Sequence, residues 1–135
     1  MRARIAIPLA VAILTAGLGG CGASEESQVR DTLATLTRAT AHKDYKTLCR
    51  KVFARVLVQR VTSIGLPCER AMGIGLSNVR RPRLKVLSVK VDGGQADAKV
   101  RSSARGEKSS VDTVHLIKED GHWRVSSLIT PQPPH

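Results

Sequence analysis

The first half of the sequence repeats its apolar residues with the period of an α-helix. Val29, Leu33, Leu36 and Thr40 follow one another at steps of four, three and four residues, so they fall on one helical face. Acidic residues precede this pattern and basic residues close it, which matches the dipole of a helix. We therefore expect an amphipathic helix with one buried face.

Shorter helical segments are expected after it. Asp44 is placed to cap a helix over residues 44–49, and an apolar pattern of helical period runs over residues 53–64 before Gly65. Residues 68–76 mix helix-forming side chains with glycines and predict a short helix. The first half of the folded part is therefore predicted to be helical.

The second half changes to the alternating pattern of β-strands. Ala96, Ala98 and Val100 share one face of a strand, and polar or charged residues occupy the other face. Glycine-containing turns at 92–94 and 119–121 indicate two hairpins. Helices followed by such a meander predict an α+β fold, in which N-terminal helices pack on a curved antiparallel sheet. Four strands are expected, over residues 84–91, 95–102, 110–117 and 122–128.

The start of the chain has the pattern of an export signal. Arg2 and Arg4 precede an uncharged, mainly apolar run over residues 5–18, which is shorter than the about 20 residues of a membrane-spanning helix. The run ends in Leu18-Gly19-Gly20-Cys21, which resembles the lipobox of bacterial lipoproteins. The resemblance implies cleavage directly before Cys21 and attachment of lipid to its thiol. A secreted protein without lipid, cut elsewhere in the leader, is the alternative.

A lipidated Cys21 sets the expected organisation of the rest. Acyl chains such as palmitate hold a protein at a bilayer without a spanning helix. We therefore expect the protein on the extracytoplasmic face of a bacterial cell membrane. The expected parts are a signal peptide (1–20), a lipidated tether (21–28), a single domain (29–129) and a frayed tail (130–135).

The remaining two cysteines, Cys49 and Cys68, then form an even pair in an oxidising compartment. A disulfide that links two helices is the simplest interpretation. Two buried free thiols, or half of a metal site, are the alternatives.

The sequence is strongly basic, with 22 Lys and Arg against 11 Asp and Glu and a formal net charge of +11. Such an excess favours anionic partners, and export makes anionic lipid headgroups or wall polymers the expected ones. Nucleic acid is not expected, because Tyr45, Phe53 and Trp123 are the only Tyr, Phe and Trp residues available for stacking. A solvated basic surface without a partner is the alternative. The candidate anion-binding residues are Arg80, Arg81, Arg83, Lys85, Lys99 and Arg101.

Four local patterns occur in a fixed order: the segment 44–49, Cys68 between Pro67 and Glu69, the turn at 92–94 and the closing segment 115–125. This order resembles the nuclear transport factor 2-like (cystatin-like cone) superfamily, particularly small exported lipoproteins of high-GC Gram-positive bacteria. The resemblance implies a cone whose open end holds a small apolar ligand, a catalytic site or a partner surface. The candidate pocket residues are Tyr45, His115 and Trp123.

No catalytic or metal site is predicted, and no cofactor is expected. The sequence has no Gly-x-Ser-x-Gly motif, and its four histidines lack metal-ligand spacing. Asp112 is a carboxylate in the middle of a predicted strand, which we interpret as an exposed residue beside Lys99 or Arg101. The leading expectation is a non-catalytic binding module for a small apolar ligand, an anionic component or an envelope protein. The alternative is a small isomerase- or dehydratase-type enzyme with Asp112 or His115 in its cavity.

Overall fold

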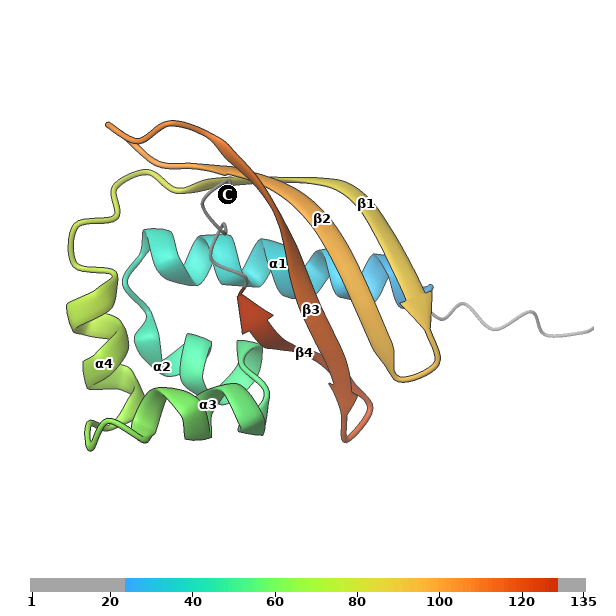
Figure 1. Cartoon of the computed structure of the whole chain (residues 1–135), viewed down its shortest axis with the longest axis horizontal. Coiled ribbons are helices and arrows are strands. Elements are labelled where there is room, and N and C mark those ends of the chain that lie inside the picture. The colour runs from blue at the N-terminus through green and yellow to red at the C-terminus, as the bar shows by residue number, and fades with distance from the viewer. Residues whose placement is uncertain (1–23, 129–135) are drawn as a thin grey trace, which may run out of the picture.

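The computed structural model describes residues 24–128 of the protein. The predicted signal peptide, Cys21 and the predicted tail lie outside the described residues. Within the described part, helical segments come first and an antiparallel sheet of four strands follows (Figure 1). The predicted α+β class is confirmed.

The longest helix, α1 (Glu25–Ala41), carries the predicted apolar face, on which Val29 is fully buried. Ser24 caps its start, because the Ser24 Oγ accepts a hydrogen bond from the Ser27 N–H at 3.1 Å. The helix therefore begins four residues before the domain start expected at residue 29, and residues 25–28 belong to the domain and not to a tether. A capping serine followed by two acidic residues was the signal for this start.

The four predicted strands form one sheet in the order β1-β2-β3-β4, with every neighbouring pair antiparallel. Figure 1 shows them curving over α1. Asp120 and Gly121, both with positive φ (49° and 79°), make the turn between the last two strands. The strands are β1 (Arg83–Asp92), β2 (Gln95–Ser103), β3 (Ser110–Glu119) and β4 (His122–Leu128).

The face of the sheet that packs against α1 forms the main core, and we call it the inner face. Ala96, Ala98 and Val100 of β2 are at most 3% exposed on it, as the alternation predicted. The opposite, outer face faces solvent. The largest fully buried side chains are Val29, Leu33, Leu48, Val52, Val100, Leu116 and Val125.

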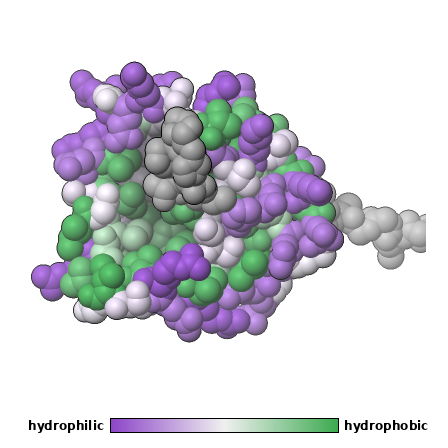
Figure 2. Space-filling view, in the orientation of Figure 1, coloured by the Kyte–Doolittle hydropathy of each residue, from purple (hydrophilic) through white to green (hydrophobic). Residues whose placement is uncertain are grey.

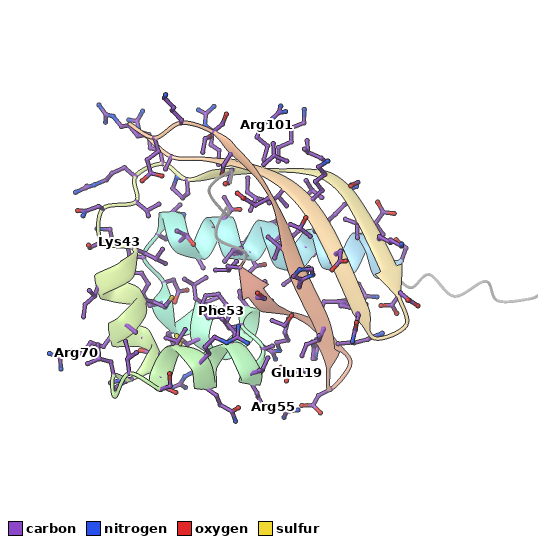
Figure 3. All side chains as sticks on the ribbon, viewed as in Figure 1. Lys43, Phe53, Arg55, Arg70, Arg101 and Glu119 are labelled. Atoms are coloured by element: carbon purple, nitrogen blue, oxygen red, sulfur yellow. A yellow bond between two sulfur atoms is a disulfide. The ribbon has the colours of Figure 1, made fainter. Side chains whose placement is uncertain are left out.

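The sequence pattern predicted that the third helix begins at Phe53, but Phe53 lies outside this helix. It forms a parallel bridge with Val125, and the Ala54 N–H donates to the Val125 carbonyl at 2.8 Å, so this segment covers the outer edge of β4. The helix α3 (Arg55–Thr62) begins two residues later. The carboxylate of Glu119 accepts a hydrogen bond from the Arg55 N–H at 3.1 Å and so satisfies one amide of the first turn (Figure 3).

Two short helical segments lie between α1 and α3. Asp44 caps α2 (Tyr45–Thr47) as predicted, since its carboxylate accepts from the Thr47 N–H at 3.0 Å. The chain then makes a π-helical turn (Leu48–Val52), in which Leu48 and Val52 are buried. This turn contributes two of the largest buried side chains and the first cysteine of the predicted pair.

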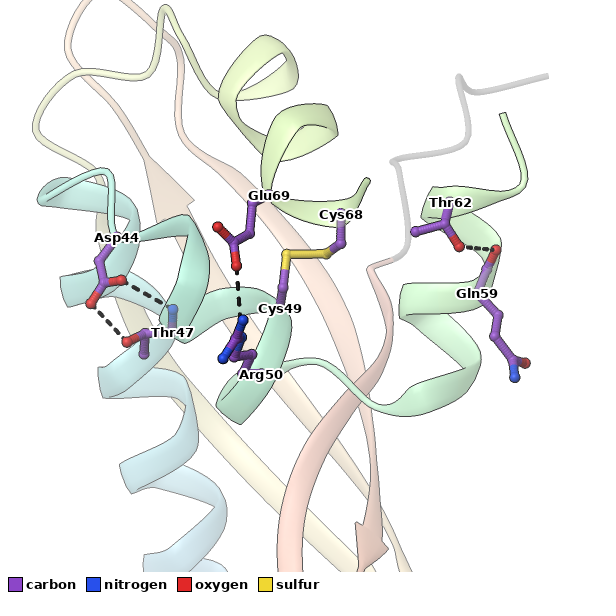
Figure 4. Close-up of a disulfide and its surroundings, with 8 residues drawn as sticks. All are labelled: Asp44, Thr47, Cys49, Arg50, Gln59, Thr62, Cys68 and Glu69. Atoms are coloured by element: carbon purple, nitrogen blue, oxygen red, sulfur yellow. Dashed lines mark hydrogen bonds and ion pairs between the residues drawn. A yellow bond between two sulfur atoms is a disulfide. The ribbon is translucent and has the colours of Figure 1, made fainter. Parts of the chain in front are cut away.

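The predicted disulfide between Cys49 and Cys68 is present (Figure 4). It joins the π-helical turn to the first residue of α4 (Cys68–Gly75), a helix in the segment where the sequence predicted one. The ion pair of Arg50 and Glu69, at 3.7 Å, lies beside it. The disulfide therefore fixes α4 against the rest of the helical layer.

Candidate functional site

An apolar pocket of about 440 Å³ lies between α1, α4 and one end of the sheet. This volume falls within the roughly 300–1,000 Å³ of typical small-molecule sites. Figure 2 shows apolar surface in the hollow near α4. Because most of its lining is carbon, the pocket suits an apolar molecule. Its main apolar lining residues are Leu36, Phe53, Met72, Leu76, Leu84 and Leu128.

One polar cluster forms part of this pocket's wall, and we call it the serine–aspartate chain. It consists of Ser102 on β2 together with Ser110 and Asp112 on β3. The Ser110 hydroxyl donates to the Asp112 carboxylate at 2.6 Å, and the Ser102 and Ser110 hydroxyls are 3.2 Å apart. Both serines line the pocket, whereas Asp112 stands behind Ser110.

The position of Asp112 corrects the expectation that it is an exposed residue beside Lys99 or Arg101. Asp112 is paired with Val100 across the strands, and paired residues share a face, so its side chain lies on the inner face. Arg101 is paired with Val111 and Lys99 with Thr113, on the outer face. The alternation itself held this signal, because Asp112 has the same parity as the apolar Val114 and Leu116.

Tyr45, His115 and Trp123 do not belong to the described residues that line the apolar pocket. Tyr45 packs against the core beside Gly73 of α4. His115 lies on the outer face, where its Nδ1 contacts the carboxylate of Asp97 on the neighbouring strand. The predicted pocket role of His115 is therefore wrong: a residue between the inward-facing Val114 and Leu116 must point outward.

Trp123 is a core residue, only 3% exposed. Its indole N–H donates to the Glu25 carboxylate at 2.6 Å, and the Lys118 ammonium reaches the same carboxylate at 2.7 Å. Hydrogen bonds from Lys118 and then Trp123 lower the pKa of Glu25 below its usual value. The three side chains thus fasten the first turn of α1 to the last hairpin. Trp123 also borders a more polar hollow of about 480 Å³ beside α1.

Most of the predicted basic residues gather at the end of the sheet where β1 begins and β2 ends, whereas Lys99 lies in the middle of β2. Lys85 and Arg101 stand directly opposite each other on the outer face. The Arg105 N–H donates to the Arg80 carbonyl at 2.8 Å, which brings the two adjoining loops together. Arg101 is labelled in Figure 3, at this end of the sheet.

This group, which we call the basic surface, comprises Arg80, Arg81, Arg83, Lys85, Lys99, Arg101 and, as an addition to the prediction, Arg105. Within residues 24–128 the six ion pairs of the structure involve none of these side chains. Arg83, together with Lys108, also lies at the mouth of the apolar pocket. The structure therefore offers unneutralised positive charge beside the pocket.

The described residues contain neither a metal-ligand cluster nor a membrane-spanning helix. No group of three or more His, Cys, Asp or Glu side chains in residues 24–128 is placed to hold a metal ion. No helix in the same part of the chain has the length and apolar character to cross a membrane.

The arrangement of helices within a curved four-stranded antiparallel sheet is the nuclear transport factor 2-like fold. A nuclear transport factor 2-like protein of unknown function from Shewanella baltica matches with a TM-score of 0.52 and 16% identity, over 73% of this chain and 85% of that one. A de novo designed protein of this fold matches with a TM-score of 0.54 and 16% identity, over 82% and 90% of the two chains. No protein-family model and no curated protein sequence matches the chain. At these identities the likeness concerns the fold.

Proposed function

We propose that this protein is a non-catalytic binding module of the bacterial envelope that holds a small, largely apolar molecule in the pocket between α1, α4 and the sheet. The observation that carries the proposal is the pocket itself, about 440 Å³ with a lining of mainly apolar side chains. Burying such a ligand's surface supplies the binding free energy, at roughly 25 cal/mol for each Å² of apolar area.

The envelope location is part of the proposal. It is supported by the export pattern of residues 1–20, by the lipobox ending in Cys21, and by the Cys49–Cys68 disulfide, which persists in oxidising compartments. A lipid on Cys21 would keep the domain near the outer surface of the cytoplasmic membrane. The mass of the native chain tests this, since an uncut leader or a free Cys21 thiol contradicts anchoring.

A variant that fills the pocket tests the binding function. Thr40 of α1 lines the pocket, and its hydroxyl donates to the Leu36 carbonyl at 2.8 Å. Thr40→Phe places a ring in the pocket and is expected to weaken binding of the neutral dye N-phenyl-1-naphthylamine at least tenfold. Thr62→Phe is the matched control, because the Thr62 hydroxyl bonds a backbone carbonyl in the same way, that of Gln59 at 3.1 Å (Figure 4).

Dye binding that is equally strong in both variants and in the unmodified protein would place the dye outside this pocket and refute the proposal. Native mass spectrometry of the full chain extracted from its own membrane complements the titration. A co-purifying small molecule, lost in Thr40→Phe and kept in Thr62→Phe, is the expected result.

The basic surface supports a second candidate function, contact with anionic lipid headgroups or wall polymers. None of its side chains takes part in an ion pair within residues 24–128, and each such charge near an anionic membrane contributes about 1 kcal/mol. The full chain carrying Cys21→Ser is expected to bind anionic vesicles more tightly than neutral ones, with an affinity that falls as salt rises. Lys85→Gln with Arg101→Gln removes part of this preference, whereas the control pair Arg60→Gln and Arg70→Gln does not. Equal binding to both vesicles contradicts the candidate.

The enzyme alternative has one supporting observation, the presence of Asp112 on the inner face. Ser110 stands between this carboxylate and the pocket, and His115 faces the other side of the sheet. An isomerase or dehydratase needs its base within hydrogen-bond reach of the substrate. The geometry therefore favours binding over catalysis.

A further inference from the structure

The serine–aspartate chain has a direction, which is set by how few protons it contains. A serine hydroxyl has one O–H to donate and two lone pairs that accept. Ser110 donates its only O–H to Asp112, at 2.6 Å. The hydrogen bond between Ser102 and Ser110, at 3.2 Å, must therefore be donated by Ser102.

Both hydroxyl protons thus point along the serine–aspartate chain towards Asp112. The lone pairs that remain belong to oxygen atoms in the pocket wall, since Ser102 and Ser110 both line the pocket. Within residues 24–128, the Ser102 hydroxyl accepts no hydrogen bond. At this part of the pocket wall the two serine oxygens can accept hydrogen bonds from a ligand, and both hydroxyl protons are already used.

The other polar groups around the pocket do not compete for this position. The hydroxyls of Thr37 and Thr40 donate to backbone carbonyls of α1, at 3.0 and 2.8 Å. Arg83, Glu107 and Lys108 are exposed at the mouth, where water competes for them. Ser103 follows Ser102 on β2, and its side chain therefore belongs to the opposite face of the strand. Ser102, Ser110 and Asp112 are each partly buried.

We propose that the serine–aspartate chain selects ligands that donate a hydrogen bond, such as an apolar molecule carrying a hydroxyl group. The ligand hydroxyl donates to the Ser102 oxygen, while its apolar body contacts the carbon lining of the pocket. Asp112 acts as a positioning residue, because it orients the two serine hydroxyls without contacting the ligand. This inference rests on the proposed function and specifies the ligand class of the same pocket.

The test compares two probes of nearly the same shape, 1-naphthol, which has a hydroxyl donor, and 1-methoxynaphthalene, which has none. The measured quantity is the ratio of their dissociation constants for the full chain and for each variant, by fluorescence titration. Ser102→Ala is expected to lower the preference for 1-naphthol about fivefold, the effect of one ordinary hydrogen bond. Ser103→Ala is the matched control and is expected to leave the ratio unchanged. Ser103 is a neighbouring serine that lines the pocket but does not belong to the serine–aspartate chain.

Asp112→Asn gives a second, independent readout. An asparagine amide can donate to Ser110, which frees the serine protons to turn towards the pocket. The preference is therefore expected to shift towards 1-methoxynaphthalene, a shift that a merely structural role of Asp112 would not produce. A ratio unchanged in both Ser102→Ala and Asp112→Asn, with both probes still bound, overturns the inference and leaves the proposed function standing. If neither probe binds the unmodified protein, the proposed function fails, and the inference fails with it.

Discussion

Removal of the Cys49–Cys68 disulfide is expected to lower both the stability of the domain and its capacity to bind a ligand. The two cysteines are 19 positions apart, and the chain-entropy relation for a loop of this length gives about 3 kcal/mol of stabilisation. A typical domain has about 5–15 kcal/mol in total, so this one bond accounts for a large share. For a domain of this size the loss corresponds to a fall in melting temperature of roughly 10–20 °C.

The assay is urea unfolding followed by far-ultraviolet circular dichroism, on the full chain with Cys49→Ala and Cys68→Ala. Because the disulfide holds the first residue of α4, and Met72 and Leu76 of α4 line the pocket, dye binding should weaken in the folded variant as well. Reduction of the unmodified protein serves as the matched comparison without a change of sequence. A loss of stability below about 0.5 kcal/mol in both would refute the reasoning that this loop closure stabilises the domain.

Three further results are expected. Leu33→Ala, at a fully buried position of α1, should lower the free energy of unfolding by about 2–5 kcal/mol in the same urea assay. Gly93→Ala should destabilise the domain by about 1 kcal/mol because Gly93 has a φ of +56°, whereas Gly75→Ala in α4 should be neutral or stabilising because its Cβ meets open space. The lowered pKa of Glu25 means that its contribution to stability is present above about pH 4.5 and is lost as pH falls through the lower folded value. Urea midpoints of the unmodified protein and of Glu25→Gln should therefore differ more at pH 7 than at pH 3; a difference that grows on acidification would contradict this assignment.

The strands and their turns could be predicted from the sequence because their signals are local. Alternation fixes which side chains share a face, and glycine in a two-residue turn fixes where a hairpin reverses. The error at Phe53 has a different origin. An apolar residue two positions before a helix fits the helical pattern equally well in two cases. It can belong to the helix, or, as here, it can form a bridge to a distant residue such as Val125.

The site was harder to predict, because its parts come together only in the folded chain. The pocket combines α1, α4 and one end of each of the four strands, and no local pattern marks such a meeting. Tyr45 and Trp123 were expected to line it, yet both pack in or against the core, and Phe53 is the aromatic residue that lines the pocket. The faces of the sheet on which Asp112 and His115 lie could have been predicted from the alternation along β3 alone. The signal peptide and the lipidation of Cys21 stay predictions.

The two outer strands of the sheet leave very different surfaces to a neighbouring molecule. The rim of β4 is occupied by the chain's own Phe53 and Ala54, whereas β1 has a partner strand on one side only. Lys85 and Lys90 are exposed residues of β1. A second copy that extended the sheet there would bring ammonium groups together, so the molecule resists ribbon-like self-assembly even at high concentration.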